Sequence, residues 1–273
     1  MASGTDAILF DLQDAVPRPQ LSEARAVVAG AIDRFASSGP AVLVRTGSSG
    51  SGDLAGDLDT VVRPGLAAVV VPMVSGPDDV SQVAAALDAL EAQRGMAAGS
   101  VAVMPLVETA RAARFCFEIA TASTRVAYMG GATAPEGDIA RDLGFTWTPS
   151  GEETLLLRSW VLLNMRAAGV ANPVSGLWPL IDDLDGLRDF ANHTRQLGYR
   201  GMMAIHPSHI AVINEVFTPT SAEIARWRAI CAALEAARSQ GTGAVRFEAG
   251  MIDEAHAHTA RAGLALARRL GCV

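Results

Sequence analysis

Three observations predict an α/β fold built on a parallel sheet. Several short apolar runs, such as 67–72 and 101–107, are continuous rather than alternating, which is typical of strands buried on both faces. The segments between these runs show the apolar spacing of amphipathic helices. The two patterns also alternate along the chain, as they do when parallel strands are joined by right-handed helical crossovers.

The number of strands makes the prediction more specific. Strands are expected at 7–11, 41–45, 67–72, 101–107, 125–130, 177–181 and 201–205. Helices are expected between them at 22–36, 77–94, 110–121, 151–168, 185–197 and 208–216. A closed (β/α)8 barrel has eight strands, so we expect a TIM-type barrel from which a first strand and its helix are missing.

The end of the chain follows a different pattern. Two alanine-rich helices are expected at 221–240 and 254–270, and the glycine-rich link 241–250 has a strand-like centre. We therefore expect a barrel domain at 1–216 and a C-terminal helical extension at 217–273 that contributes to oligomer contacts.

Composition and charge exclude several classes of protein. The chain has 273 residues, half of them hydrophobic, which suits one barrel-sized domain. No apolar run approaches the roughly 18 residues of a membrane span, and the start lacks a secretory signal, so we expect a cytoplasmic protein. The net charge is −7 and basic residues form no clusters. Nucleic acid and anionic membranes are therefore not expected as partners.

The basic residues and the cysteines narrow the chemistry. All 22 basic residues are arginine, which excludes a lysine Schiff base and a P-loop lysine. Any carbon–carbon bond chemistry must then use a metal or another electrophile. The three cysteines are too widely spaced for a Cys-x-x-Cys metal site or a disulfide framework, and we expect buried or incidental thiols at Cys116, Cys231 and Cys272.

Two acids follow predicted strands. Glu108 comes directly after 101–107, and Asp138 comes shortly after 125–130. Ligand sites of parallel α/β folds lie at the carboxyl ends of the strands, and Mg²⁺ prefers few carboxylates together with water and substrate oxygens. We therefore predict a magnesium site at Glu108 and Asp138. The alternative is that both acids stabilise the starts of the helices that follow them.

A second group of polar residues lies at the ends of the first two strands. Arg45 closes 41–45 and could bind a substrate carboxylate through two hydrogen bonds, or form an ion pair with a rim acid such as Asp14. Asp11, Gln13 and Asp14 follow each other at the end of 7–11. They are expected to bind substrate or orient metal-bound waters, or else to cap the next loop.

Weaker signals come from two later strand ends. Gly130 and Gly131 offer backbone N–H groups near the predicted site. His206 and Pro207 follow the last strand, and His206 could act as a general acid or base or as a hydrogen-bonded turn residue. All four are predicted substrate-binding residues.

Taken together, these segments resemble the HpcH/HpaI aldolase and citrate lyase β-subunit family, in its CitE-like branch. The resemblance spans nearly the whole chain, and its specificity lies in the order and spacing of the matching segments. They are 6–16, 44–45, 71–72, 106–110, 137–138, 205–208 and 250–253.

The resemblance implies a TIM-type barrel that forms a homotrimer or hexamer and uses Mg²⁺ to break or form the bond beside a 3-hydroxyacyl thioester carbonyl. The products would be an acyl-CoA and a 2-oxo acid. Glu108 and Asp138 match the family's metal ligands, and Arg45 matches its substrate-binding arginine. Asp11 and Asp14 match the acids near the metal-bound waters.

Asp253 also has a family counterpart. It matches an acid that reaches the active site of a neighbouring subunit and acts as acid or base on the acyl-CoA carbon. From the sequence alone, Asp253 is an N-cap before the helix 254–270. Both interpretations predict an aspartate at this position.

Other activities within the same family stay open. Gln13 stands where the family usually has glutamate, Met73 where it usually has lysine, and the segment 130–137 is longer than usual. One alternative is a malyl-CoA thioesterase or a malate synthase-like enzyme. The other is a non-catalytic family member.

Overall fold

The computed structural model describes residues 4–36, 39–131 and 136–273, which divide into two compact units, Met1–Ile213 and Asn214–Val273. The first unit holds a seven-stranded sheet in which each strand pairs in parallel with the next strand along the chain. The strands are β1 (Ala7–Asp11), β2 (Ala41–Arg45), β3 (Leu66–Val71), β4 (Ala102–Val107), β5 (Tyr128–Gly131), β6 (Asn172–Ser175) and β7 (Gly201–Met202). This confirms the predicted TIM-like α/β fold.

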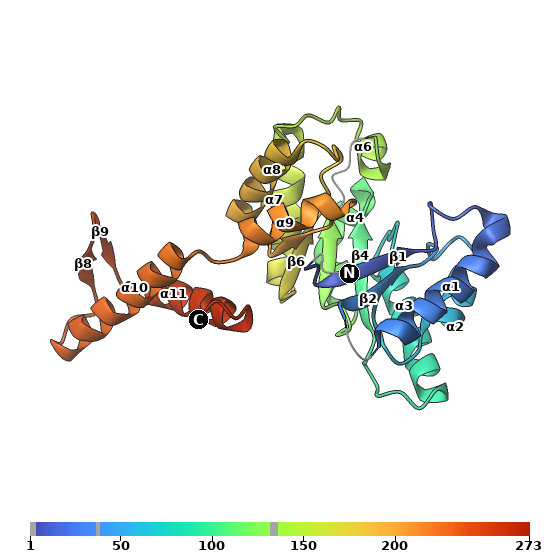
Figure 1. Ribbon diagram of the computed structural model, residues 1–273, viewed down its shortest axis with the longest axis horizontal. Coiled ribbons are helices and arrows are strands. Elements are labelled where there is room, and N and C mark those ends of the chain that lie inside the picture. The colour runs from blue at the N-terminus through green and yellow to red at the C-terminus, as the bar shows by residue number, and fades with distance from the viewer. Residues whose placement is uncertain (1–3, 37–38, 132–135) are drawn as a thin grey trace. The chain divides into compact units, whose positions relative to one another are not determined.

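Helices connect the strands and flank the sheet (Figure 1). They are α1 (Leu21–Phe35), α2 (Leu54–Val61), α3 (Pro77–Gln93), α4 (Ala110–Arg114), α5 (Cys116–Thr121), α6 (Asp138–Leu143), α7 (Glu152–Ala167), α8 (Leu184–Leu197) and α9 (Pro207–Phe217), with a 3-10 turn at Arg18–Gln20. No helix in the described residues is long and apolar enough to cross a membrane.

Strands β3 and β4 are buried on both faces, as their continuous apolar sequences predict, whereas β1 is partly exposed. In β3, Val69 and Val71 belong to the large core cluster that also contains helix residues, whereas Val70 packs with Met104 and Leu106 on the other face. Successive side chains of a strand point to opposite faces. Strand β3 therefore supplies apolar side chains to two layers, and polar side chains such as Arg45 and Glu108 lie at the ends of the neighbouring strands.

A buried ion pair lies at the amino end of the strands, opposite the predicted site. Glu91 on α3 is 1% exposed, and its Oε1 and Oε2 accept hydrogen bonds from Nη1 and Nη2 of Arg125 at 2.9 and 2.5 Å. Glu91 also accepts the N–H groups of Gly99 and Val101. The hydrogen bonds from Arg125 lower the pKa of Glu91 to about 2. In barrels of this type, polar groups at the amino end of the strands mainly serve stability.

Two local predictions are wrong. The predicted strand 177–181 is a loop, and the strand is β6, which begins five residues earlier. The predicted helix 110–121 is broken at Phe115 into α4 and α5. Helix α2 was not predicted.

The cysteines agree with the expectation of buried or incidental thiols. Cys116 is fully buried, and burial raises the pKa of its thiol to about 12. Cys231 and Cys272 are partly buried, and all three are free thiols.

The second unit is a pair of helices with a small hairpin. It contains α10 (Ser221–Ser239), the antiparallel strands β8 (Val245–Phe247) and β9 (Gly250–Ile252), and α11 (Glu254–Arg269). Ile230, Ile252 and Ala260 form a core between these elements.

Candidate active site

Arg45 and Asp11 form the best-defined pair at the carboxyl ends of the strands. The parallel register of β1 and β2 places the two residues opposite each other. Arg45 Nε donates to Asp11 Oδ1 at 2.8 Å, and Nη2 donates to Oδ2 at 2.5 Å. Asp14 is more distant, with 3.8 Å between its Oδ2 and Arg45 Nη1. Arg45 is thus paired with a rim acid, but mainly with Asp11 rather than Asp14.

The environment of Asp11 keeps it ionised. Burial alone would raise its pKa, but hydrogen bonds from Arg45 and from the backbone N–H of Gln13 outweigh this effect, so the pKa lies below its usual value. Asp11 also accepts the N–H of Ala15 at 3.3 Å, and therefore caps the loop after β1. The side-chain oxygen Oε1 of Gln13 is buried and has no hydrogen-bond partner among the described residues.

Glu108 directly follows β4 and is 7% exposed. Its Oε2 accepts the backbone N–H of Met73 at 2.8 Å, and Met73 has a left-handed φ of 53°. Within the described residues, no hydrogen bond is made to the other oxygen, Oε1. Glu108 is not the cap of α4, because Thr109 occupies that position and accepts the N–H of Ala112.

The pKa of Glu108 is shifted by burial and by charged groups nearby. Burial raises the pKa of Glu108, against the lowering effects of the Met73 N–H and the Arg45 guanidinium. The carboxylates of Asp138 and Asp14 raise it further. Arg45, Asp138 and Asp14 therefore lie within electrostatic range of Glu108.

Asp138 is the first residue of α6, and its side chain forms an ion pair with Arg141 one turn later. Arg141 also lines a hollow of about 420 Å³ beside α6. The other residues that line this hollow are Glu136, Ala140, Phe145, Thr146 and Trp147. Residues 132–135 of the long segment 130–137 lie outside the described part of the chain.

The two glycines of β5 lie in a closely packed part of the sheet. Each pairs with both neighbouring strands in the sheet. A Cβ on Gly130 would lie 2.8 Å from Leu106, and one on Gly131 would lie 3.4 Å from Val161. A side chain at position 130 would therefore displace the ends of the Leu106 and Met104 side chains.

His206 is held in a turn. Its Nδ1 lies 2.7 Å from Ser208 Oγ and 3.3 Å from the backbone N of Ser208, and Pro207 begins α9. This matches the interpretation of His206 as a turn residue, and its role as acid or base stays a prediction. Asp253 lies in the second unit, where it caps α11 by accepting the N–H of Ala255 at 3.1 Å.

One polar group at the strand ends was missed from the sequence. Ser175 ends β6 and is 1% exposed, and its hydroxyl has no hydrogen-bond partner in the part of the chain that the structure describes. It pairs in register with Gly131 and Met202. If the strand had been predicted at 172–175, Ser175 would have been recognised as a residue at a strand end.

The donors available for a metal are few. In the part of the chain that the structure describes, no group of three or more His, Cys, Asp and Glu side chains is arranged to hold a metal ion. Glu108 and Asp138 offer two carboxylates, and Glu108 Oε1 is free of hydrogen bonds. This donor set suits Mg²⁺, which is usually held by one or two carboxylates and keeps several waters.

The chain is similar to several known proteins. A model of the HpcH/HpaI aldolase/citrate lyase family matches residues 1–207. A citrate lyase subunit beta-like protein of Deinococcus radiodurans is 35% identical over 92% of this chain and 86% of its own length. A (3S)-malyl-CoA thioesterase of Cereibacter sphaeroides is 29% identical over 97% of this chain and 87% of its own.

Solved structures agree with this relationship. The protein CitE from Mycobacterium tuberculosis, in complex with magnesium, acetoacetate and coenzyme A, has a TM-score of 0.75 and 27% identity, and the match covers 97% of this chain and 91% of CitE. A citrate lyase from Burkholderia xenovorans has a TM-score of 0.84, covers 97% of this chain and 84% of its own, and at 21% identity supports the fold alone. The chain belongs to the HpcH/HpaI aldolase/citrate lyase family of lyase-type enzymes.

Proposed function

We propose that this protein is a Mg²⁺-dependent carbon–carbon lyase that cleaves a 3-hydroxyacyl thioester into an acyl-CoA and a 2-oxo acid. The observation that carries the proposal is the buried carboxylate of Glu108, held by the Met73 N–H and within electrostatic range of Asp138 and Arg45. Related CitE structures contain magnesium with coenzyme A and acetoacetate, or with oxaloacetate.

Glu108 and Asp138 would hold the metal. When bound, Mg²⁺ supplies Lewis acidity at the oxygen of the substrate hydroxyl, which carries negative charge as the carbon–carbon bond breaks. Before the metal can use Asp138, Arg141 must leave that carboxylate. The unpaired Oε1 of Gln13 is a buried acceptor, and a hydroxyl or water of the loaded site would satisfy it.

Arg45 would bind the carboxylate of the oxo acid. Asp11 already occupies Nε and Nη2, so the remaining Nη1 edge is the one that can meet the substrate. The ion pair with Asp11 also holds the guanidinium plane in one orientation. Binding energy at Arg45 thus depends on Asp11, although Asp11 itself need not touch the substrate.

Asp253 of a neighbouring copy would deliver the proton to the acyl carbon, or remove it in the reverse direction. The C-terminal unit, our proposed oligomer extension, carries this residue at the start of α11. A homotrimer or hexamer, and a cytoplasmic location, belong to the same proposal.

Calorimetric titration tests the proposal. Pyruvate, glyoxylate and oxaloacetate are each titrated into the protein with and without Mg²⁺, using the wild type, Glu108→Gln and the exposed-site control Glu118→Gln. We expect metal-dependent binding of one oxo acid, lost by at least about 100-fold in Glu108→Gln, since even the partners of metal ligands contribute about 10- to 100-fold. Full affinity in Glu108→Gln would contradict the metal site.

A second candidate is a thioesterase, favoured by the 29% identity to a malyl-CoA thioesterase. Both activities start from an acyl thioester but differ in products. A thioesterase releases free CoA thiol without an aldehyde or oxo acid, and a lyase releases an oxo acid and keeps the thioester. Assaying thiol and oxo acid in the same reaction with malyl-CoA separates them.

A further inference from the structure

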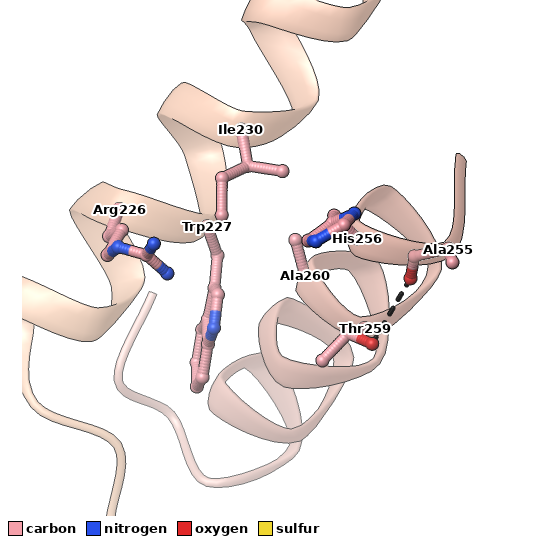
Figure 2. Close-up of a pocket in the computed structure, with 7 residues that line it drawn as sticks. All are labelled: Arg226, Trp227, Ile230, Ala255, His256, Thr259 and Ala260. Atoms are coloured by element: carbon pink, nitrogen blue, oxygen red, sulfur yellow. Dashed lines mark hydrogen bonds between the residues drawn. The ribbon is translucent and has the colours of Figure 1, made fainter. Parts of the chain in front are cut away.

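A small hollow of about 260 Å³ lies between α10 and α11 (Figure 2). The residues that line it are Arg226, Trp227, Ile230, Ala255, His256, Thr259 and Ala260. Figure 2 shows the indole of Trp227 and the imidazole of His256 directed into the space between the helices. His256 therefore borders this hollow while its Nδ1 faces Asp253.

The contacts of His256 Nδ1 require two different protonation states. Nδ1 lies 2.7 Å from Asp253 Oδ1 and 3.2 Å from the backbone N of Asp253. The first contact is attractive only if a proton lies between the ring nitrogen and the carboxyl oxygen, because two lone pairs would repel at this distance. The second contact requires a lone pair on Nδ1, because the backbone N–H is the donor. One nitrogen is thus placed to give a proton to the carboxyl, or to accept the backbone N–H once that proton has left.

We infer that Asp253 and His256 share a proton, and that His256 is a positioning residue that restores the proton of Asp253 during turnover. The inference rests on the proposed function of Asp253. The shared proton passes from His256 Nδ1 through the carboxyl of Asp253 to the acyl carbon, and Nδ1, left with a lone pair, then accepts the backbone N–H of Asp253. A solvent proton, equal to the one released from the substrate hydroxyl, restores the pair. No net proton is consumed.

The other charges around this pair are already matched. Arg226 of α10 is paired with Glu248 of the β8–β9 turn at 3.1 Å. Glu254 is paired with Arg238 of α10 at 2.5 Å and with Arg261 of α11 at 2.7 Å.

His258 also contacts Glu254, at 3.4 Å, rather than Asp253. Within the described residues, His256 is the one ionisable side chain in hydrogen-bond contact with Asp253. The hydrogen bond from His256 lowers the pKa of the Asp253 carboxyl.

A purely structural role must be separated from this one. Asp253 and His256 form a capping box, in which the residue three positions into the helix accepts the N–H of the cap. Glutamine is a standard residue at that position. His256→Gln therefore preserves the cap and removes the imidazole ring, and His258→Gln is the matched control.

The first experiment needs no substrate. The side-chain carboxyls of the full-length protein are labelled with ¹³C, and Asp253→Asn assigns the Asp253 signal in the pH titration. We expect the pKa of Asp253 to rise toward its usual value in His256→Gln and to stay unchanged in His258→Gln. The same Asp253 pKa in the wild type and in His256→Gln would overturn the inference.

The second experiment measures turnover of glyoxylate with acetyl-CoA or propionyl-CoA and Mg²⁺ across pH. We expect His256→Gln to lower kcat by about 10-fold or more, at the low end of general acid–base effects, with an unchanged KM for glyoxylate. Added imidazole should restore part of kcat in His256→Gln alone. A capping role would not produce this rescue.

The outcomes also separate the inference from the proposed function. If His256→Gln matches the wild type at every pH, the inference is wrong and the lyase proposal stands. If the wild type shows no turnover but the Asp253 pKa still depends on His256, the shared proton stands and the proposed function is wrong.

Discussion

Arg45 places two of its nitrogens on Asp11, with Nε 2.8 Å from Oδ1 and Nη2 2.5 Å from Oδ2. Neither side chain is fully buried, at 23% and 22% exposure, so the pair is accessible to a ligand. A guanidinium held along one edge presents its other edge in a fixed direction. Asp11 is therefore an orienting partner of Arg45.

The first prediction concerns this pair. Asp11→Asn should raise the Kd for the oxo acid by about 10- to 100-fold, since hydrogen bonds between charged groups contribute about 1.5–3 kcal/mol. Asp14→Asn should have a smaller effect, because Asp14 is mostly exposed and lies 3.8 Å from Arg45. Titration of both variants with Mg²⁺ present checks this order. Equal losses in both variants would argue against an orienting role for Asp11.

The second prediction concerns the competition for Asp138. Arg141 holds the carboxylate that we assign to the metal, so Arg141→Met should tighten metal binding. Exposed ion pairs contribute about 0.2–1 kcal/mol, so the expected gain is about 1.5- to 5-fold. Mn²⁺ binding measured by electron paramagnetic resonance checks it, with the exposed Arg34→Met as control. Weaker binding in Arg141→Met would mean that Arg141 assists the metal instead of competing with it.

The third prediction concerns the buried pair of Glu91 and Arg125. Glu91→Gln should lower the free energy of unfolding by about 3–5 kcal/mol, because it leaves a buried guanidinium without its main partner. Asp33→Asn, which breaks the exposed pair of Asp33 with Arg63, should cost less than about 1 kcal/mol. Urea denaturation of the variants compares the two. Similar losses in the two variants would show that Asp88, the second partner of Arg125, is enough to stabilise the buried guanidinium without Glu91.

The same pair predicts a pH dependence. The pKa of Glu91 falls from an ordinary 4.5 to about 2 on folding. Its contribution is therefore fully present above pH 4.5 and is lost as the pH falls through about 2. The wild type should lose stability faster than Glu91→Gln between these limits. If the free energy of unfolding fell equally with pH in the two proteins, groups other than Glu91 would cause the loss of stability in acid.

The fourth prediction uses two helical glycines. A Cβ at Gly263 of α11 would lie 2.6 Å from the ring of Trp227, whereas a Cβ at Gly30 of α1 would meet nothing within 4 Å. Gly263→Ala should destabilise the C-terminal unit by about 1–3 kcal/mol through overpacking. Gly30→Ala should stabilise its helix by about 0.5–1 kcal/mol. Thermal unfolding that moves in the same direction in both variants would contradict this packing.

The sequence was sufficient where a buried strand has a distinctive composition. The run of valines in β3 and the apolar run of β4 predicted both strands within one residue of their ends. It failed at β6, where Asn172 and Pro173 disfavour a strand by composition. The more apolar 177–181 was chosen instead, although Trp178 packs there in a loop and donates to the Asp183 carbonyl. Packing in the tertiary fold, rather than local strand preference, therefore determines that 172–175 and not 177–181 forms the strand.

The candidate site was predictable in its residues but not in its pairings. Position at a strand end was enough to select Glu108 and Arg45. It did not predict that Asp11 would be the main partner of Arg45, because pairing depends on the register of β1 and β2. The contact of Asp138 with Arg141 depends on where α6 begins, and the preceding segment gives no signal for that. The neighbouring-copy role of Asp253 stays a prediction.

The hydrogen bond from Met73 to Glu108 comes from the main chain. Any residue that can adopt the left-handed turn at position 73 can supply the same N–H, at a cost of about 1–3 kcal/mol where it is not glycine. The side chain at position 73 can therefore change in size or charge while the carboxylate keeps its place. Substitutions at position 73 can thus accumulate without loss of the hydrogen bond that holds Glu108.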